Sequence, residues 1–91
     1  MSATAIVTIK VLPESPQSPL HDIKIKIIHL FEQNGGRSIT VEEQPVAFGL
    51  KALIVKAAVP EEKGTDFFES HLAKIPHVSS VSIEDYRRAF G

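Results

Sequence analysis

Two segments in which apolar residues recur at helical spacing each lie between segments in which they alternate, and this order limits the folds open to the chain. The alternating segments, which predict strands, are residues 5–12, 38–43, 50–59 and 78–84. The segments with helical spacing, which predict helices, are residues 20–33 and 66–75. The order strand, helix, strand, strand, helix, strand is that of two split β-α-β halves. It predicts an α+β sandwich in which both helices cover one face of a four-stranded antiparallel sheet.

The ends of these segments carry residues that stop regular structure. Pro13, Pro16 and Pro19 follow the first strand and remove backbone donors from its continuation. Residues 34–36, Asn-Gly-Gly, end the first helix because asparagine and glycine accept the left-handed conformation. Thr65 stands directly before the second helix and is its predicted N-cap. The second strand is short and polar at its end, which is typical of a strand at the edge of a sheet.

The bulk properties are those of an ordinary globular protein. The chain has 91 residues, 43% of them hydrophobic and 23% charged, and residues 1–91 are expected to form one domain. It has no cysteine, which excludes disulfide scaffolds, thiol catalysis and thiolate metal sites. Ten basic and eleven acidic residues give a net charge of −1, which does not favour nucleic acid binding. Because no apolar run reaches the ~20 residues that span a bilayer, and the first residues carry no basic group of a signal peptide, we expect a cytoplasmic protein.

The motifs that carry catalysis or bind cofactors are missing from the sequence. Residues 35–38, Gly-Gly-Arg-Ser, lack the lysine of a phosphate-binding loop, and no G-x-G-x-x-G occurs. The four histidines occur at no spacing typical of metal sites. The sequence does leave open that His29 and His71, on the two predicted helices, lie close together in the fold. The acidic pairs at 42–43 and 61–62 point apart in an extended chain, whereas paired catalytic carboxylates must converge. We therefore expect no catalytic residue, no metal and no cofactor.

One loop carries a side chain that is poorly suited to a core. Phe48 lies beside Gly49, directly before the third predicted strand. A large ring in a turn next to a flexible glycine is well placed to contact another molecule. Lys51 follows it, and the only adjacent basic pair, Arg87 and Arg88, lies near the C-terminus. An aromatic anchor with basic neighbours is typical of a protein interface, although most lysines and arginines are simply solvated charges.

The chain also resembles a known family over almost its whole length. The segments that carry the resemblance are residues 8–16 (TIKVLPESP), 45–53 (PVAFGLKAL), 64–66 (GTD) and 81–88 (VSIEDYRR). Taken in this order, they are similar to archaeal translation elongation factor 1-beta, the nucleotide exchange factor for elongation factor 1-alpha. The fold of that family is ferredoxin-like, which is the βαββαβ order that the periodicity predicts.

The resemblance implies that the chain binds the elongation factor 1-alpha GTPase and speeds the release of GDP, so that GTP can bind. Such a role needs no covalent chemistry and no nucleotide bound by the chain itself. From the near-neutral charge and the lack of a long apolar run, we also expect no direct contact with nucleic acid or with a membrane. The sequence lacks the long N-terminal extension of eukaryotic relatives, so we expect the exchange domain alone.

The resemblance also assigns residues to the interface with the GTPase. They are Phe48, Gly49, Lys51, Tyr86, Arg87 and Arg88. Phe48 matches the aromatic residue that the family presents to its partner. The run from Tyr86 to Arg88 lies where eukaryotic relatives carry an aromatic residue, a polar residue and a lysine that reaches toward the partner's magnesium site. Here arginine replaces lysine, and its planar head is not equivalent to an ammonium group, so the resemblance leaves this role to Arg87 or Arg88.

Two other classes of function stay open. A small-molecule-binding regulatory domain of ferredoxin-like fold would need a pocket with converging polar groups, and the sequence indicates none. RNA binding on the sheet would need exposed aromatic residues on the two central strands. The outward positions predicted on those strands hold Thr8, Lys10, Ala52, Ile54 and Lys56.

Overall fold

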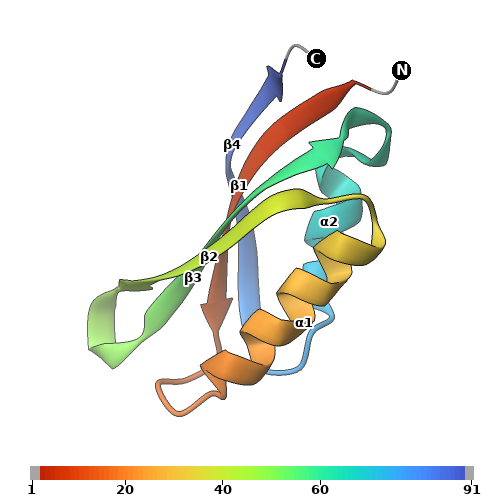
Figure 1. Ribbon diagram of the computed structural model, residues 1–91. Coiled ribbons are helices and arrows are strands. Elements are labelled where there is room, and N and C mark those ends of the chain that lie inside the picture. Colours follow the sequence, from red (N-terminus) through yellow and green to blue (C-terminus); the bar gives the residue numbers. More distant parts are fainter. Residues whose placement is uncertain (1–2, 90–91) are drawn as a thin grey trace.

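The structure, a computed structural model, describes residues 3–89. Its strands and helices, in chain order, are β1 (Thr4–Pro13), α1 (Leu20–Gln33), β2 (Arg37–Pro45), β3 (Lys51–Pro60), α2 (Gly64–Ala73) and β4 (Val78–Ala89). Short 3-10 turns precede β3, at Ala47–Gly49, and α2, at Glu61–Lys63. The predicted order of elements is confirmed, and the fold is an α+β, ferredoxin-like sandwich (Figure 1).

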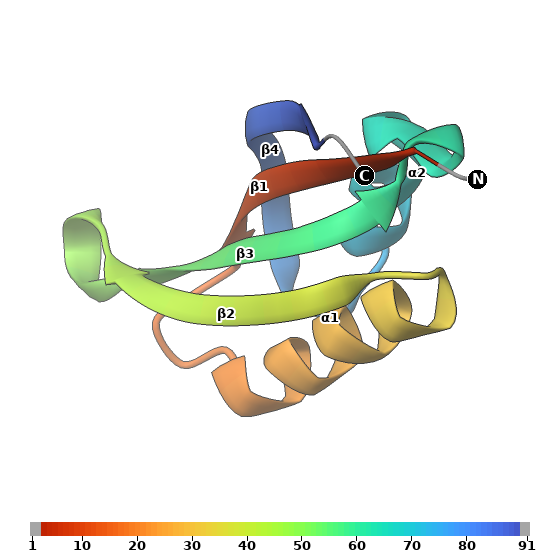
Figure 2. The same ribbon diagram turned by 45° about the horizontal axis from the view of Figure 1, so that its top comes forward.

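The strands form one sheet in the order β2-β3-β1-β4, and every neighbouring pair is antiparallel. β2 lies at an edge, as its short polar sequence predicts, and β3 and β1 are central. Both helices cover one face of the sheet, and the other face is open (Figures 1 and 2). In both views the connection between β2 and β3 projects at one end of the sheet, while β1 begins and β4 ends at the other.

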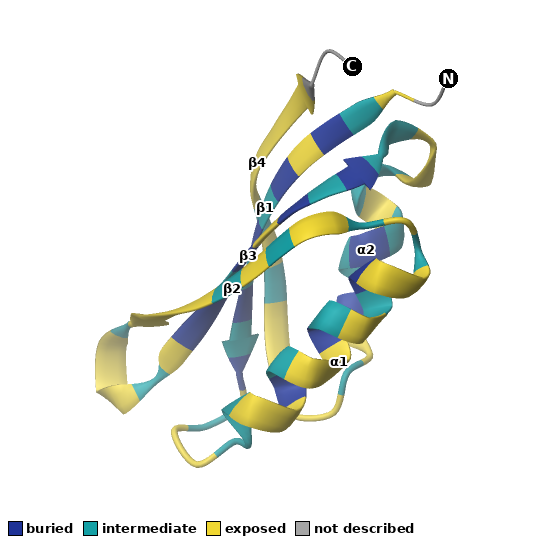
Figure 3. Ribbon diagram, in the orientation of Figure 1, coloured by how far each residue is buried: buried dark blue, intermediate teal, exposed yellow. Residues whose placement is uncertain are grey.

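The core lies between the sheet and the two helices. Its buried residues are Ala5, Val7, Ile9, Val11, Ile23, Ile27, Phe31, Leu53, Val55, Ala57, Val59, Phe68 and Leu72. Buried positions alternate along β1, as expected for a strand covered on one face (Figure 3). Phe31 of α1 stacks on Phe68 of α2, with ring centroids 4.5 Å apart and planes within 3° of parallel. This contact joins the two helices above the sheet.

The ends of the helices agree with the sequence in one case and differ in the other. At the end of α1, Asn34 is the C-cap and Gly35 has a φ of 82°, as predicted for a glycine stop. The predicted N-cap of α2 was wrong. The helix begins at Gly64, so Lys63 takes the N-cap position and Thr65 lies within the first turn. Gly64 has a φ of 74° and a ψ of 161°, so the chain changes direction sharply between the 3-10 turn and the helix.

β4 is longer than its alternation predicted. It continues past residue 84 to Ala89, because β1 reaches back to Thr4 and pairs with it over this length. Tyr86, Arg87 and Arg88 therefore lie in an edge strand rather than in a C-terminal tail. Because successive side chains of a strand lie on alternate faces, the strand determines on which face of the sheet each of them lies.

Candidate functional site

The turn at Ala47–Gly49 presents a phenylalanine to solvent, as the sequence indicated. Phe48 is 94% exposed. Its backbone is left-handed, with a φ of 62° and a ψ of 30°, and Gly49 follows with a φ of 76°. The hairpin closes around them, because the backbone N–H of Val46 donates to the carbonyl oxygen of Leu50 at 2.8 Å. Left-handed backbone is strained for a bulky residue, and together with the exposed ring it indicates contact with another molecule.

A groove of about 410 Å³ opens beside this turn on the uncovered face of the sheet. Its apolar lining consists of Leu12, Val46, Ala47, Phe48 and Leu50. Lys10 of β1 and Glu84 of β4 add one charge of each sign, and Ser80 and Ser82 complete the β4 side. This groove was not among the features predicted from the sequence. The signal was present in the alternation, which places Lys10 and Leu12 on the same outward face of β1.

An ion-pair cluster lies at the base of the same hairpin. Glu43 of β2 accepts from Lys24 of α1, with Nζ 2.6 Å from Oε2, and its other oxygen lies 3.7 Å from Nζ of Lys51. The hydrogen bond from Lys24 and the charges of both lysines lower the pKa of Glu43 below its ordinary value. Lys51, predicted as a partner-binding residue, thus forms an ion pair with Glu43 of its own chain while its side chain stays exposed. The cluster ties the hairpin that carries Phe48 to the helix layer.

The second part of the predicted interface lies on β4, after an irregularity in its pairing with β1. Ile9 pairs with Ile83 but Thr8 pairs with Asp85, so Glu84 is an extra residue in the strand. A bulge of one residue moves every later side chain to the opposite face. Tyr86 and Arg88 therefore lie opposite Val7 and Ala5 on the helix-covered face, whereas Arg87 lies opposite Ile6 on the open face.

Both arginines of β4 have carboxylate partners within the chain. Nε of Arg87 lies 2.9 Å from Oδ2 of Asp85, two residues earlier on the same strand. Nε of Arg88 lies 2.7 Å from Oε1 of Glu61, in the turn before α2. Tyr86 is 39% exposed beside them.

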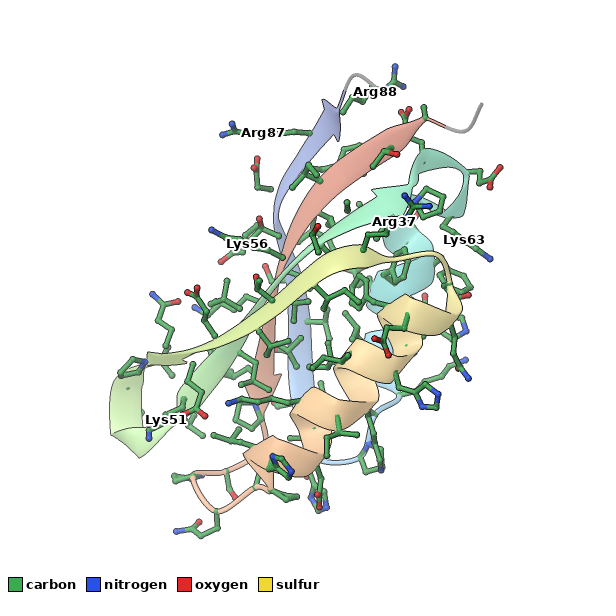
Figure 4. All side chains as sticks on the ribbon, viewed as in Figure 1. Arg37, Lys51, Lys56, Lys63, Arg87 and Arg88 are labelled. Atoms are coloured by element: carbon green, nitrogen blue, oxygen red, sulfur yellow. The ribbon has the colours of Figure 1, made fainter. Side chains whose placement is uncertain are left out.

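The two parts of the predicted interface lie at opposite ends of the molecule. Leu53 of β3 pairs with Val11 of β1, and Arg88 pairs with Ala5 of β1. At about 3.3 Å per residue this places roughly 20 Å between the two levels of the sheet, and the Phe48 turn lies farther out still. Figure 4 shows Lys51 at the hairpin end and Arg87 and Arg88 at the other. The structure therefore does not gather the predicted residues into one compact site.

Residues 3–89 show no sign of a buried polar site or of a metal site. In that range no polar or charged residue is fully buried, and no three His, Cys, Asp or Glu side chains gather as metal ligands. Neither of the helices there has the length and apolar character that crossing a membrane requires.

An exposed, strained aromatic turn beside a groove on an α+β sandwich is typical of a domain that contacts another protein. The family of the EF-1 guanine nucleotide exchange domain matches residues 6–89. The chain belongs to this family, and its function is guanine nucleotide exchange in translation elongation.

Relatives named elongation factor 1-beta match over most of their length. The protein from Methanothermobacter thermautotrophicus is 39% identical over 84 residues, covering 91% of this chain and 93% of the relative. The protein from Methanosarcina acetivorans is 41% identical over 81 residues, covering 87% and 91%. The protein from Desulfurococcus amylolyticus is 34% identical over 88 residues, covering 94% and 97%. A solved structure described as a putative antibiotic biosynthesis monooxygenase from Bacillus cereus covers 100% of the chain and is itself covered to 96%, with 16% identity and a TM-score of 0.47.

Proposed function

We propose that this chain binds elongation factor 1-alpha in the cytoplasm and speeds the release of its GDP, without covalent chemistry of its own. The observation that carries the proposal is Phe48, a 94% exposed aromatic residue held in a left-handed turn beside an apolar groove. Membership of the exchange-domain family, and relatives named elongation factor 1-beta, support the choice of partner.

The contact with the GTPase is proposed to have two ends. At the hairpin end, Phe48 and the groove provide apolar area, and Lys51 provides charge. At the other end, the exposed guanidinium groups of Arg87 and Arg88 provide donors. Because roughly 20 Å of sheet separates these ends, a partner that touches both must extend along the length of the domain. Two separate contacts would fix the orientation of the GTPase better than one.

The exchange follows from a difference in binding. A GTPase holds GDP through phosphate-binding amides, a lysine and Mg²⁺. A protein that binds the nucleotide-free state more tightly than the GDP-bound state lowers the affinity for GDP by the same factor. An arginine near the Mg²⁺ region would add a permanent positive charge there and disfavour the metal ion. The apolar anchor at the hairpin would supply binding free energy that does not depend on the nucleotide.

The test follows fluorescent GDP on elongation factor 1-alpha. The GTPase is loaded with the labelled nucleotide, an excess of unlabelled GTP is added, and release is measured with and without this chain. We expect release to become faster with increasing concentration of the chain and to saturate. Phe48→Ala and Arg88→Ala should each weaken the acceleration. No acceleration by the unmodified chain would reject the proposed function, and unchanged rates in both variants would reject the proposed site.

A further inference from the structure

The two arginines of β4 differ in what holds them. Arg87 is paired with Asp85 of its own strand, and both residues are exposed, with side-chain fractions of 79% and 46%. Arg88 is paired with Glu61 of a different element, and here the fractions are 78% and 21%. The carboxylate of Glu61 is therefore the covered half of its pair, and the arginine is the exposed half.

Glu61 is itself fixed by the backbone around it. Its N–H donates to the carbonyl oxygen of Ala3 at 3.0 Å, which joins the turn to the chain just before β1. Pro60 precedes it with a φ of −64°, and Glu61 begins the 3-10 turn that leads, through the positive-φ residue Gly64, to α2. The backbone of Glu61 is thus held, and its side chain is shorter and more covered than that of Arg88, so it is the less mobile member of the pair.

The bulge at Glu84 brings this pair together. Without the extra residue, regular alternation would place Arg88 on the open face of the sheet, away from the turn before α2. With it, Arg88 lies opposite Ala5 on the helix-covered face, the side from which Glu61 reaches it (Figure 4 shows Arg88 at this end). The ion pair thus depends on a specific irregularity of the sheet.

The contact also leaves the arginine able to bind something else. The guanidinium group has five N–H donors, and the contact with Glu61 is made at Nε. The two terminal nitrogens carry the other four donors and form the outer edge of the group. An arginine oriented through Nε can therefore present this edge to a second negatively charged group.

We propose that Glu61 is a positioning residue that orients Arg88 for contact with the nucleotide site of the GTPase. This rests on the proposed exchange function. An arginine side chain has many rotamers, and a partner must restrict them on binding. Glu61 restricts them beforehand, so the cation already lies in place when the complex forms. The same reasoning selects Arg88 over Arg87, whose carboxylate partner comes only from its own exposed strand.

The test compares Glu61→Gln with a matched control, Glu62→Gln, which makes the same charge change in the same exposed turn. Labelled GDP release from elongation factor 1-alpha is measured over a range of concentrations of each variant. We expect Glu61→Gln to lower the maximal rate about three- to fivefold, the scale of one partly exposed charge-assisted hydrogen bond, with little change in the half-saturating concentration. The maximal rate with Glu61→Asp should lie between the rates with Glu61→Gln and Glu62→Gln. Asp85→Asn should lower the maximal rate less than Glu61→Gln does.

A double-variant comparison separates positioning from a general effect on the fold. If Glu61 acts through Arg88, then adding Glu61→Gln to Arg88→Ala causes no further loss. A loss that persists undiminished in the Arg88→Ala background, or an exchange rate of Glu61→Gln equal to that of the unmodified chain, would overturn the proposal.

A measurement without the GTPase tests the contact itself. The Nε–H signal of Arg88 in a nitrogen–proton NMR spectrum should exchange more slowly with water in the unmodified chain than in Glu61→Gln. Equal rates of proton exchange with water in the two proteins would also overturn the proposal. Because this readout needs no partner, a failure of the proposed exchange function is distinguished from a failure of the positioning role.

Discussion

Two phenylalanines of this chain have opposite environments, and replacing each should separate partner binding from stability. Phe48 is 94% exposed, whereas Phe68 is fully buried and stacks on Phe31. Phe48→Ala removes little that is buried on folding, so we expect a change in unfolding free energy within about 0.5 kcal/mol. Phe48→Gly should also leave the unfolding free energy nearly unchanged. Glycine relieves about 1 kcal/mol of left-handed strain in the folded state, but it raises the entropy of the unfolded chain by a similar free energy. Phe68→Leu removes the stacked ring from the core and should destabilise the fold by about 1–2 kcal/mol.

The expected effect on exchange is reversed. A phenylalanine ring buries about 150–200 Å² in an interface, which at roughly 25 cal/mol per Å² gives at most about 4–5 kcal/mol. Ordering of the turn and imperfect fit reduce this to about 2–3 kcal/mol, the range of an aromatic hot spot. Phe48→Ala should therefore raise the half-saturating concentration for GDP release about 30- to 150-fold. Phe68→Leu, assayed below its unfolding temperature, should keep the exchange activity.

Urea denaturation gives the stabilities, and labelled GDP release from elongation factor 1-alpha gives the activities. A destabilisation of Phe48→Ala by more than ~1.5 kcal/mol would contradict this prediction, since an exposed ring cannot contribute that much to folding. The prediction also fails if Phe48→Ala releases GDP as efficiently as the unmodified chain at the same stability. In that case the strained turn would have another cause, and the hairpin end would not be the anchor.

Three further variants test the hairpin, the groove and the end of α1. Glu43→Gln should be less stable than the unmodified chain near pH 7. Thermal melts should show this difference in stability shrinking as the pH falls below about 4.5. The reason is that the pKa of Glu43 is lowered in the folded state, and its carboxylate loses the attraction of both lysines when it is protonated. Ser82→Arg should fill the groove and slow GDP release, whereas Thr40→Arg, outside the groove on the same open face, should leave GDP release unchanged. Each arginine lies opposite a lysine, Lys10 or Lys56, so both variants should lose a similar small amount of stability. Gly35→Ala should cost about 1–3 kcal/mol in denaturant unfolding. Its φ is 82°, and a Cβ would lie 2.9 Å from Cγ of Pro60.

The elements of this fold follow from periodicity because each depends mainly on residues close in sequence. Ile23, Ile27 and Phe31 lie on one stripe of α1, and this stripe is what the core buries. The exposure of Phe48 was also predictable, because a ring beside Gly49 in a turn has no core to enter. The left-handed backbone of Phe48 itself was not predictable, since it arises from the closure of the hairpin between β2 and β3.

The groove and the separation of the two interface ends depend on strand register, which the sequence determines only through the whole sheet. Lys10 and Leu12 are outward on β1 by alternation, but that they face Ser82 and Ser80 is a property of the β1–β4 pairing. Likewise, nothing local in the sequence places the Phe48 turn and Arg88 at opposite ends. That follows once all strands are antiparallel and in register.

The bulge at Glu84 shows most clearly where local reasoning stops. Val81 and Ile83 point toward the helices, and continuing their alternation would point Arg87 in the same direction and Arg88 away. The extra residue reverses both assignments. Glutamate carries no turn signal that would mark a bulge, unlike a glycine in a strand. Which arginine meets Glu61 is therefore decided by a single unpaired residue in the sheet rather than by the Arg-Arg sequence itself.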